Sequence, residues 1–430
     1  MASVSPPLDS NASPQAQAAA TQSAPANPVD YSATDTTNEP PSVQIGSGNA
    51  VSAVPKRFQY ALRLNLRTVY DDNIYLQQFN RVGDVYFAIE PGLTIGFGDI
   101  VGSDMNSIRI DYAPSFFLYA DHSNANSLQH LINLTGAYHM GHLSLSLSEN
   151  VQILDGTINP GASNFGATAT NPTPTLNLDT GGNTSVNIFN TNAGFSYDLT
   201  AKTFLSGGMA LQAYDYQQQL ISSEQLQGNL FINYIYSPKL TAGLGATFGY
   251  NWVDGNNPDQ SFQQVNVRTT YQVSGKVSLN GSVGVEFREF ENDVRGGTYV
   301  SPVFELGATY QPFDGTQINL NATRRIQNSA VLAGQDYNQT FINIGIRQRF
   351  MRRFYFGLSG GYERSDYFNT VEFVSATRSD DYLFVQPSVD VTLTRFWTAG
   401  AYYLHRRDNS SYNAFTFHDN QVGFRTSLTF

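Results

Sequence analysis

Apolar and polar residues alternate along most of this chain, and this alternation limits the possible fold more than any other feature. In the segment 276–290, Val283 and Val285 fall on one face, whereas Glu286 and Arg288 fall on the other. A repeat of two residues is the spacing of a β-strand with one apolar and one polar face. No helical pattern with a repeat near 3.6 separates the segments. The sequence therefore predicts an all-β protein.

The number of alternating segments and the lengths of their connections indicate a barrel. Tight turns such as "MGH", "YSPK" and "VSGK" alternate with long polar connections such as "DHSNANS" and "VDGNNPDQ". Short periplasmic turns and long extracellular loops are typical of outer-membrane β-barrels. We predict a transmembrane antiparallel β-barrel of about 18 strands, with 16 as the alternative, and both ends in the periplasm. The segments lie near 57–70, 84–97, 107–121, 127–140, 142–154, 184–199, 202–216, 223–237, 239–253, 260–274, 276–290, 298–311, 315–327, 338–350, 352–366, 379–394, 396–407 and 416–430.

The composition agrees with a barrel and excludes several other classes. Only 14% of the residues are charged and 13% are aromatic, whereas soluble domains carry about 25% charged residues. The absence of cysteine excludes disulfides and thiolate metal sites. The net charge of −11 argues against nucleic acid as a partner. No apolar run approaches the 18 or so residues of a membrane-spanning helix.

The first part of the chain differs from the rest. Residues 1–55 consist mainly of Ala, Ser, Pro, Thr, Asn and Gln, as in "ASPQAQAAATQSAPANP". A segment with so few large apolar residues cannot bury enough surface to fold. We therefore predict a disordered periplasmic arm over 1–55 and a single barrel domain over 56–430.

Aromatic residues recur where the strands run into the long loops. Examples are Tyr70, Tyr119, Tyr214, Trp252 and Tyr402, each followed within a few residues by Asp or Asn. Amphipathic rings are favoured where hydrocarbon meets lipid headgroups. This recurrence predicts that the long loops emerge at one membrane surface, and it makes outer-membrane lipid and lipopolysaccharide expected contacts.

The chain closes on an alternating strand that ends in phenylalanine. Phe424, Leu428 and Phe430 share its apolar face in "NQVGFRTSLTF". Such an ending resembles the signal that the barrel-assembly machinery recognises in outer-membrane proteins. We expect these three residues to face lipid and to serve as that signal.

The polar faces should line a lumen, because they are too polar for a packed core and 18 strands enclose a space wide enough for water. Pairing between neighbouring arginines and carboxylates would stiffen such a wall. Alternatively the charges form a substrate path, in which Arg325, Arg347 and Arg349 make a basic ladder that favours anions. The candidate pore-lining residues are Arg63, Arg67, Glu90, Arg109, Asp111, Arg268, Glu286, Arg288, Glu305, Arg325, Arg347, Arg349, Glu363, Asp390 and Arg425.

No motif in the sequence is convincing evidence of a catalytic or metal site. The run 357–361 matches G-x-S-x-G, but a hydrolase needs a strand-to-helix elbow there, and the run lies within an alternating strand. His139 and His142 flank a turn without an evident third metal ligand. The acidic loop 254–259 lacks the spacing of an EF-hand, which leaves weak cation binding as an alternative to plain turn chemistry. We expect no enzyme activity, no cofactor and no resident metal.

Three stretches resemble a family of large outer-membrane barrels called putative β-barrel porin 2, often found in Gram-negative exopolysaccharide loci. They are "TVYDDNIY" at 68–75, "YAPSFFLYADHSN" at 112–124, and the closing run that begins with "DDYLFVQPSVDV" and ends with "NQVGFRTSLTF". The resemblance covers most of 57–430. It implies an outer-membrane location and an association with polysaccharide export, with polysaccharide and periplasmic export proteins as candidate partners. It implies no catalytic residues.

These observations predict a pore for polysaccharide export or for small polar solutes. The alternative is a non-conducting surface barrel that acts as scaffold or assembly partner. The connection 155–183 separates the two, because a loop of this length can fold inward as a constriction or plug. The N-terminal arm is a second candidate plug.

Overall fold

The computed structural model describes residues 58–98, 106–156, 177–182, 184–217, 220–255, 257–291, 298–371, 374 and 378–430. These residues form one 18-stranded antiparallel sheet in which every strand pairs with its neighbours in sequence. The first strand, β1 (Phe58–Asp71), also pairs with the last, β18 (Phe417–Thr429), so the sheet closes on itself. The predicted fold class is confirmed, with 18 strands. The arm predicted over 1–55 lies outside the described residues.

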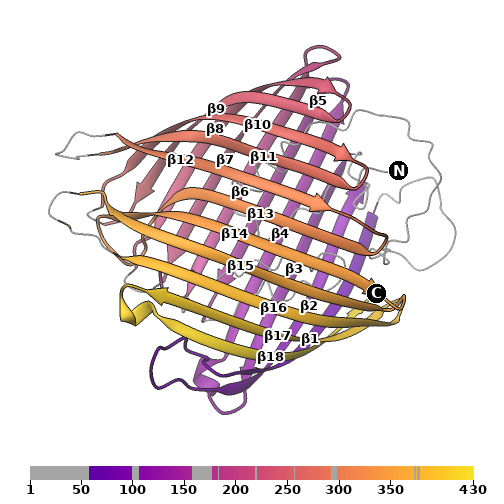
Figure 1. Ribbon diagram of the computed structural model, residues 1–430, viewed down its shortest axis with the longest axis vertical. Coiled ribbons are helices and arrows are strands. Elements are labelled where there is room, and N and C mark those ends of the chain that lie inside the picture. Colours follow the sequence, from indigo (N-terminus) through magenta and orange to yellow (C-terminus); the bar gives the residue numbers. More distant parts are fainter. Residues whose placement is uncertain are drawn as a thin grey trace.

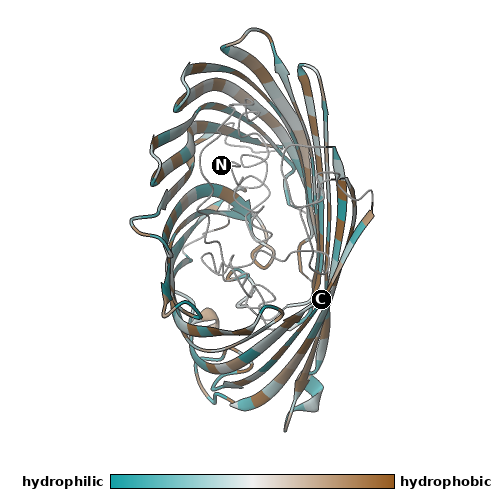
Figure 2. Cartoon of the chain, turned by 90° about the vertical axis from the view of Figure 1, so that its right-hand side faces the viewer, coloured by the Kyte–Doolittle hydropathy of each residue, from teal (hydrophilic) through white to brown (hydrophobic). Residues whose placement is uncertain are grey.

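The strands are long and tilted, and they form a barrel whose ring is elongated when it is viewed from one end (Figures 1 and 2). Between the first and last strands the remaining ones are β2 (Asp84–Gly98), β3 (Ser107–Tyr119), β4 (Ser127–Met140), β5 (Leu143–Leu154), β6 (Val186–Asp198), β7 (Thr203–Tyr216), β8 (Ser223–Ser237), β9 (Leu240–Val253), β10 (Gln260–Ser274), β11 (Val277–Phe290), β12 (Tyr299–Tyr310), β13 (Thr316–Asn328), β14 (Gln335–Phe350), β15 (Phe354–Asn369), β16 (Ser379–Thr394) and β17 (Trp397–Ser410).

Most strand boundaries lie within two or three residues of the predicted ones. The largest differences are of three residues, and one of them is at β17, which continues to Ser410 rather than to 407. The other two occur together: β14 begins at Gln335 rather than near 338, and β15 continues to Asn369 rather than to 366. Both extensions point toward the long-loop end of the barrel. They belong to a part of the wall that leaves the regular cylinder, as described below.

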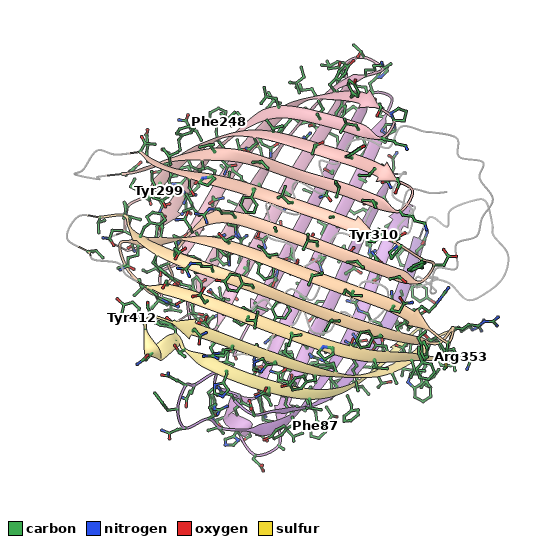
Figure 3. The ribbon with its side chains drawn as sticks, viewed as in Figure 1. Phe87, Phe248, Tyr299, Tyr310, Arg353 and Tyr412 are labelled. Atoms are coloured by element: carbon green, nitrogen blue, oxygen red, sulfur yellow. The ribbon has the colours of Figure 1, made fainter. Side chains whose placement is uncertain are left out.

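The alternation assigns each strand an outer apolar face and an inner polar face. Large apolar side chains are exposed on the outside, among them Phe87, Phe248 and Tyr310 (Figure 3). Along the ribbons, apolar and polar residues follow one another (Figure 2). Exposed apolar rings around a closed sheet form a surface suited to lipid. Within the described part of the chain, no helix has the length and apolar character needed to cross a membrane.

The predicted loop-end aromatics separate into two groups. Tyr70 and Trp252 are exposed on the outer surface, as is Tyr403, the residue that follows Tyr402. Tyr119 and Tyr402 instead face inward and are buried, Tyr119 against Tyr86 at 5.5 Å between ring centroids. The pair Tyr402–Tyr403 shows the reason, since adjacent strand residues point to opposite faces. An aromatic position near a strand end therefore does not by itself place the ring in lipid.

The closing strand is placed as its alternation predicts. Phe424 and Phe430 are each 65% exposed on the outer face. Backbone hydrogen bonds of 2.8 and 3.1 Å join Phe430 to Leu62, so the last residue is part of the seam between β18 and β1. The ring of Phe430 also stacks on Phe396 at 6.4 Å.

Candidate functional site: the barrel lumen

Inward-pointing arginines and carboxylates form ion pairs along the lumen wall. Arg67 pairs with Glu90 of the neighbouring strand at 2.5 Å, and both side chains are buried. Such pairs orient long side chains and stiffen the wall. Three further pairs join predicted pore-lining residues: Arg109–Asp111 at 2.7 Å, Arg288–Glu286 at 2.7 Å and Arg425–Asp390 at 2.6 Å.

Other predicted pore-lining residues form hydrogen bonds with uncharged side chains. Arg268 donates to Asn233 at 2.8 Å and to Ser206, and its guanidinium lies over the Phe231 ring. Arg325 donates to Gln339, which in turn donates to Glu363 at 2.6 Å. The remaining inner-face positions are Arg63 and Arg349 near the turn end, Arg347 over the Tyr355 ring at 4.4 Å, and Glu305 on β12.

The three arginines proposed as a ladder do not form one. Arg347 is the register partner of Gln317, whereas Arg325 is the partner of Gln339. Along β14 the positions 339 and 347 are eight residues apart, which is about 27 Å at ~3.4 Å per residue. Arg347 and Arg349 therefore make a basic pair near the turn end, and Arg325 lies near the loop end.

At the loop end, part of the wall folds into the lumen. The pairing of β12 with β13 begins only at Phe304 and Arg324, so β13 leaves the cylinder beyond this point. The ends of β13 and β14 stay paired with each other and form a hairpin, residues 325–339, which we call the flap. Phe368 of β15 follows it inward and stacks on Tyr299 of β12 at 4.1 Å. The outer face of the flap consequently packs against the inner, lumen-facing side of strands β9–β12.

Buried polar contacts join the flap to that wall. Asp336 accepts from Gln260 at 3.1 Å and lies 3.7 Å from Arg288. Asn338 contacts Ser301 at 3.0 Å and donates to Tyr299 at 2.6 Å. Gln260, Arg288, Ser301 and Asp336 are each at most 2% exposed. Alternation in a regular cylinder would turn Asp336 toward lipid, so only the inward fold brings this carboxylate to Gln260 and Arg288.

The described part of the connection between β5 and β6 lies on the lumen side of the flap. Asp179 is the centre of this segment, residues 177–182, which we call the inner loop. Its carboxylate accepts from Ser329 Oγ at 2.8 Å, Ala330 N at 2.5 Å and Tyr367 OH at 2.8 Å. Arg378 lies 3.6 Å from the same carboxylate and donates to the carbonyl oxygens of Leu178 and Asp179, both at 2.9 Å.

The inner loop connects opposite sides of the lumen. Asn177 donates to Tyr216 of β7 at 2.5 Å. Leu178 packs in an apolar cluster with Tyr382 and Phe384 of β16 and Phe417 of β18. Since β7 and β16 are nine strands apart in a closed ring of 18, they are opposite walls. A segment that contacts both walls narrows the lumen between them.

Burial and charge act in opposite directions on the Asp179 carboxyl. Burial raises its pKa, because the charged form loses contact with water, whereas Arg378 and three hydrogen-bond donors lower it. Burial is the larger effect, so the pKa lies above its usual range. Arg378 is itself buried between the rings of Phe415 and Tyr367. The inner loop is therefore anchored by a charge pair that depends on both partners.

Comparison with known proteins identifies the family of this barrel. A family model described as "Putative beta-barrel porin 2" matches residues 58–430. The chain belongs to this family. It is thus a porin-like barrel, a class of channels. No curated protein matches the sequence.

Several solved structures are similar in architecture. OccAB3 of Acinetobacter baumannii shares 11% identity at a TM-score of 0.45, with 86% of this chain and 99% of that chain covered. OpdK of Pseudomonas aeruginosa shares 11% identity at a TM-score of 0.40, with 86% and 98% covered. OprD of Pseudomonas aeruginosa shares 12% identity at a TM-score of 0.39, with 86% and 95% covered.

Sequence reasoning singled out the connection 155–183 but not its anchor, Arg378, which precedes β16 in a loop. It also missed Asp336, because alternation places this residue on the lipid face. The G-x-S-x-G run lies inside β15, where Ser359 donates to the Gln386 carbonyl at 3.3 Å. His139 contacts Ser144 at 2.8 Å.

Proposed function

We propose that the protein is an outer-membrane channel for small polar solutes, with its loop end narrowed by the inner loop and the flap. The observation that carries this proposal is the inner loop held on two opposite walls by Tyr216 and Arg378. The polar inner face and the apolar outer face support a water-filled barrel in lipid. In this proposal the turns and both chain ends face the periplasm, and the outer-face residues Phe424, Leu428 and Phe430 carry the assembly signal.

A narrowed entrance favours small solutes over a polymer, and this separates the proposal from its alternatives. Polysaccharide export, which the family resemblance suggests, requires a path for an extended chain through the same opening. A scaffold role requires no path at all. The constriction therefore favours diffusion of small solutes over polysaccharide export and over a scaffold role.

Conductance of the purified chain in planar bilayers tests the channel. We expect steady steps that fall when small neutral sugars are added to the bath, because sugars that enter the lumen displace conducting water. Sugars above a size limit should leave the conductance unchanged. A chain that inserts as a folded barrel but gives no steps would support the scaffold role and contradict the channel. Loss of current on adding long polysaccharide chains would favour export.

The basic pair near the turn end should set ion preference. Replacing Arg347 and Arg349 together by alanine removes two positive charges from the inner face, so the reversal potential in a salt gradient should shift toward cations. The matched control is Arg352 with Arg353 replaced by alanine, two exposed arginines in the adjoining turn. Equal reversal potentials for the Arg347/Arg349 variant and the wild type would remove these residues from the conduction path.

A further inference from the structure

Three carboxylates meet at the loop end of the seam that closes the barrel. Asp71 ends β1, Asp72 follows it, and Asp419 lies on β18. One oxygen atom from each lies within 4.8 Å of the other two. Asp71 and Asp72 belong to "TVYDDNIY", and Asp419 directly precedes "NQVGFRTSLTF".

The local charges do not balance. Asp71 and Asp419 are at most 1% exposed, and Asp72 is half-buried. The buried Arg406 donates to Asp419, and Arg81 lies 3.8 Å from Asp72 at the edge of the cluster. Three carboxyl groups thus face one buried guanidinium, that of Arg406, and a second, partly exposed one at the edge, that of Arg81. Carboxylates are buried in proteins when they are paired or when they coordinate a metal.

One buried oxygen at this place has no partner. The oxygens of Asp71 accept from Asn73 N at 2.7 Å and from Gln421 Nε2 at 2.9 Å. Both oxygens of Asp72 accept from Asn420, each at 2.7 Å. By contrast Asp419 Oδ1 has no hydrogen-bond partner among the described residues, although the side chain is fully buried. Native structures rarely leave such an atom unsatisfied, and a bound cation would satisfy it.

The number and kind of the ligands select among cations. Calcium binds carboxylate oxygens at about 2.3–2.6 Å, so two ligands of one ion can lie up to about 5 Å apart, which accommodates three oxygens within 4.8 Å of one another. Magnesium gives up its bound water reluctantly and is usually held by only one or two carboxylates. Zinc prefers nitrogen and sulfur ligands in proteins, and the cluster offers carboxylate oxygens. We propose that Asp71, Asp72 and Asp419 bind a calcium ion.

The position of this site indicates a structural role for the ion. The register of the seam ends with Asp71 opposite Gln421, and Asp72 N donates to the Asn420 carbonyl at 3.1 Å just beyond it. Calcium bound here would link the first and last strands where their hydrogen-bond ladder stops. It would also neutralise the carboxylates that otherwise repel each other across the seam. A barrel lacks exposed strand edges only while this seam is closed.

Calorimetric titration of calcium into the detergent-purified full chain tests the site, after treatment with EGTA. We expect calcium binding that survives a tenfold excess of magnesium. Asp419→Asn should weaken this binding at least about tenfold, because a ligand charge is lost. The matched control is Asp215→Asn, which removes one exposed carboxylate from the loop end of β7. It should bind calcium as the wild type does.

Thermal unfolding supplies the second readout. Calcium should raise the unfolding midpoint of the wild type and of Asp215→Asn relative to EGTA, because the ion binds only the closed seam. This shift should be lost in Asp419→Asn. If that variant does not fold, Asp72→Asn, which changes the half-buried member, replaces it. Equal calcium binding and equal midpoint shifts in the folded variant and the wild type would overturn the proposal. So would a wild type that binds no calcium, as expected if Asp71 and Asp419 simply share a proton.

Discussion

Replacing Arg378 by alanine is expected to release the inner loop and raise the conductance of the channel. The change removes the cation beside Asp179 and both donors to the carbonyl oxygens of Leu178 and Asp179. Removing one partner of a buried ion pair lowers the stability of the paired state by about 3–5 kcal/mol. Since each 1.4 kcal/mol is about tenfold in an equilibrium constant, the anchored state should lose at least about a hundredfold in population relative to the released state. Single-channel recordings should show larger or longer open levels.

The matched control for this variant is Arg364→Ala. Arg364 lies on the outer face of β15, is 44% exposed at its side chain and pairs with Asp366 and Asp381. Its removal should leave the conductance unchanged, because exposed pairs contribute little. Wild-type conductance and open probability in Arg378→Ala would show that the inner loop does not limit the current.

Acid should partly reverse the effect of Arg378→Ala. Burial raises the pKa of Asp179, so the anchored state takes up a proton at a higher pH than the released state, where the carboxyl has its ordinary pKa. Protonation therefore stabilises the anchored state as the pH falls. The variant also lacks the guanidinium that lowers this pKa, and the other groups facing the carboxyl, Tyr367 and Ser329, remain as donors. Conductance should fall again as the pH is lowered, and not in the double variant with Asp179→Asn.

Alternation could predict the barrel because it is a local signal repeated around the whole ring. Each strand of an antiparallel barrel has one lipid face and one water face, so a period of two marks every strand independently. Pairs such as Arg67–Glu90 follow from the same rule, since inner-face residues on adjacent strands are neighbours. The alternation also places Arg406 and Asp419 on the inner face, so the sequence held a signal for the seam cluster, although neither residue is among the predicted pore-lining residues.

Alternation could not predict the flap, because the outer face of its strands packs against protein instead of lipid. Asp336 and Asn338 occupy positions that face lipid on a regular cylinder, yet they are buried against β10–β12. The signal is a polar pair on an expected apolar face, which indicates that the face is covered by protein. Arg378 had no signal of this kind, since its role depends on a loop almost 200 residues earlier in the chain reaching across the lumen.

The flap interface gives the second large expected effect. Arg288→Ala should lower the free energy of unfolding by about 3–5 kcal/mol, because it leaves the buried carboxylates of Glu286 and Asp336 without their cation. Arg288 also donates to Gln260 at 2.7 Å and lies over the Phe262 ring at 5.0 Å. The unfolding midpoint, measured by circular dichroism in detergent, should fall accordingly.

A compensated variant separates lost charge balance from lost packing. In Arg288→Met with Glu286→Gln and Asp336→Asn, no buried charge remains unpaired and the side chains keep similar volumes, so most of the stability should return. Hydrogen exchange should locate the defect of Arg288→Ala in the flap, residues 325–339, and in β11 rather than in the seam between β1 and β18. Equal destabilisation of the single and compensated variants would show that Arg288 acts through packing alone. A neutral Arg288→Ala would show that the flap does not depend on this ion pair.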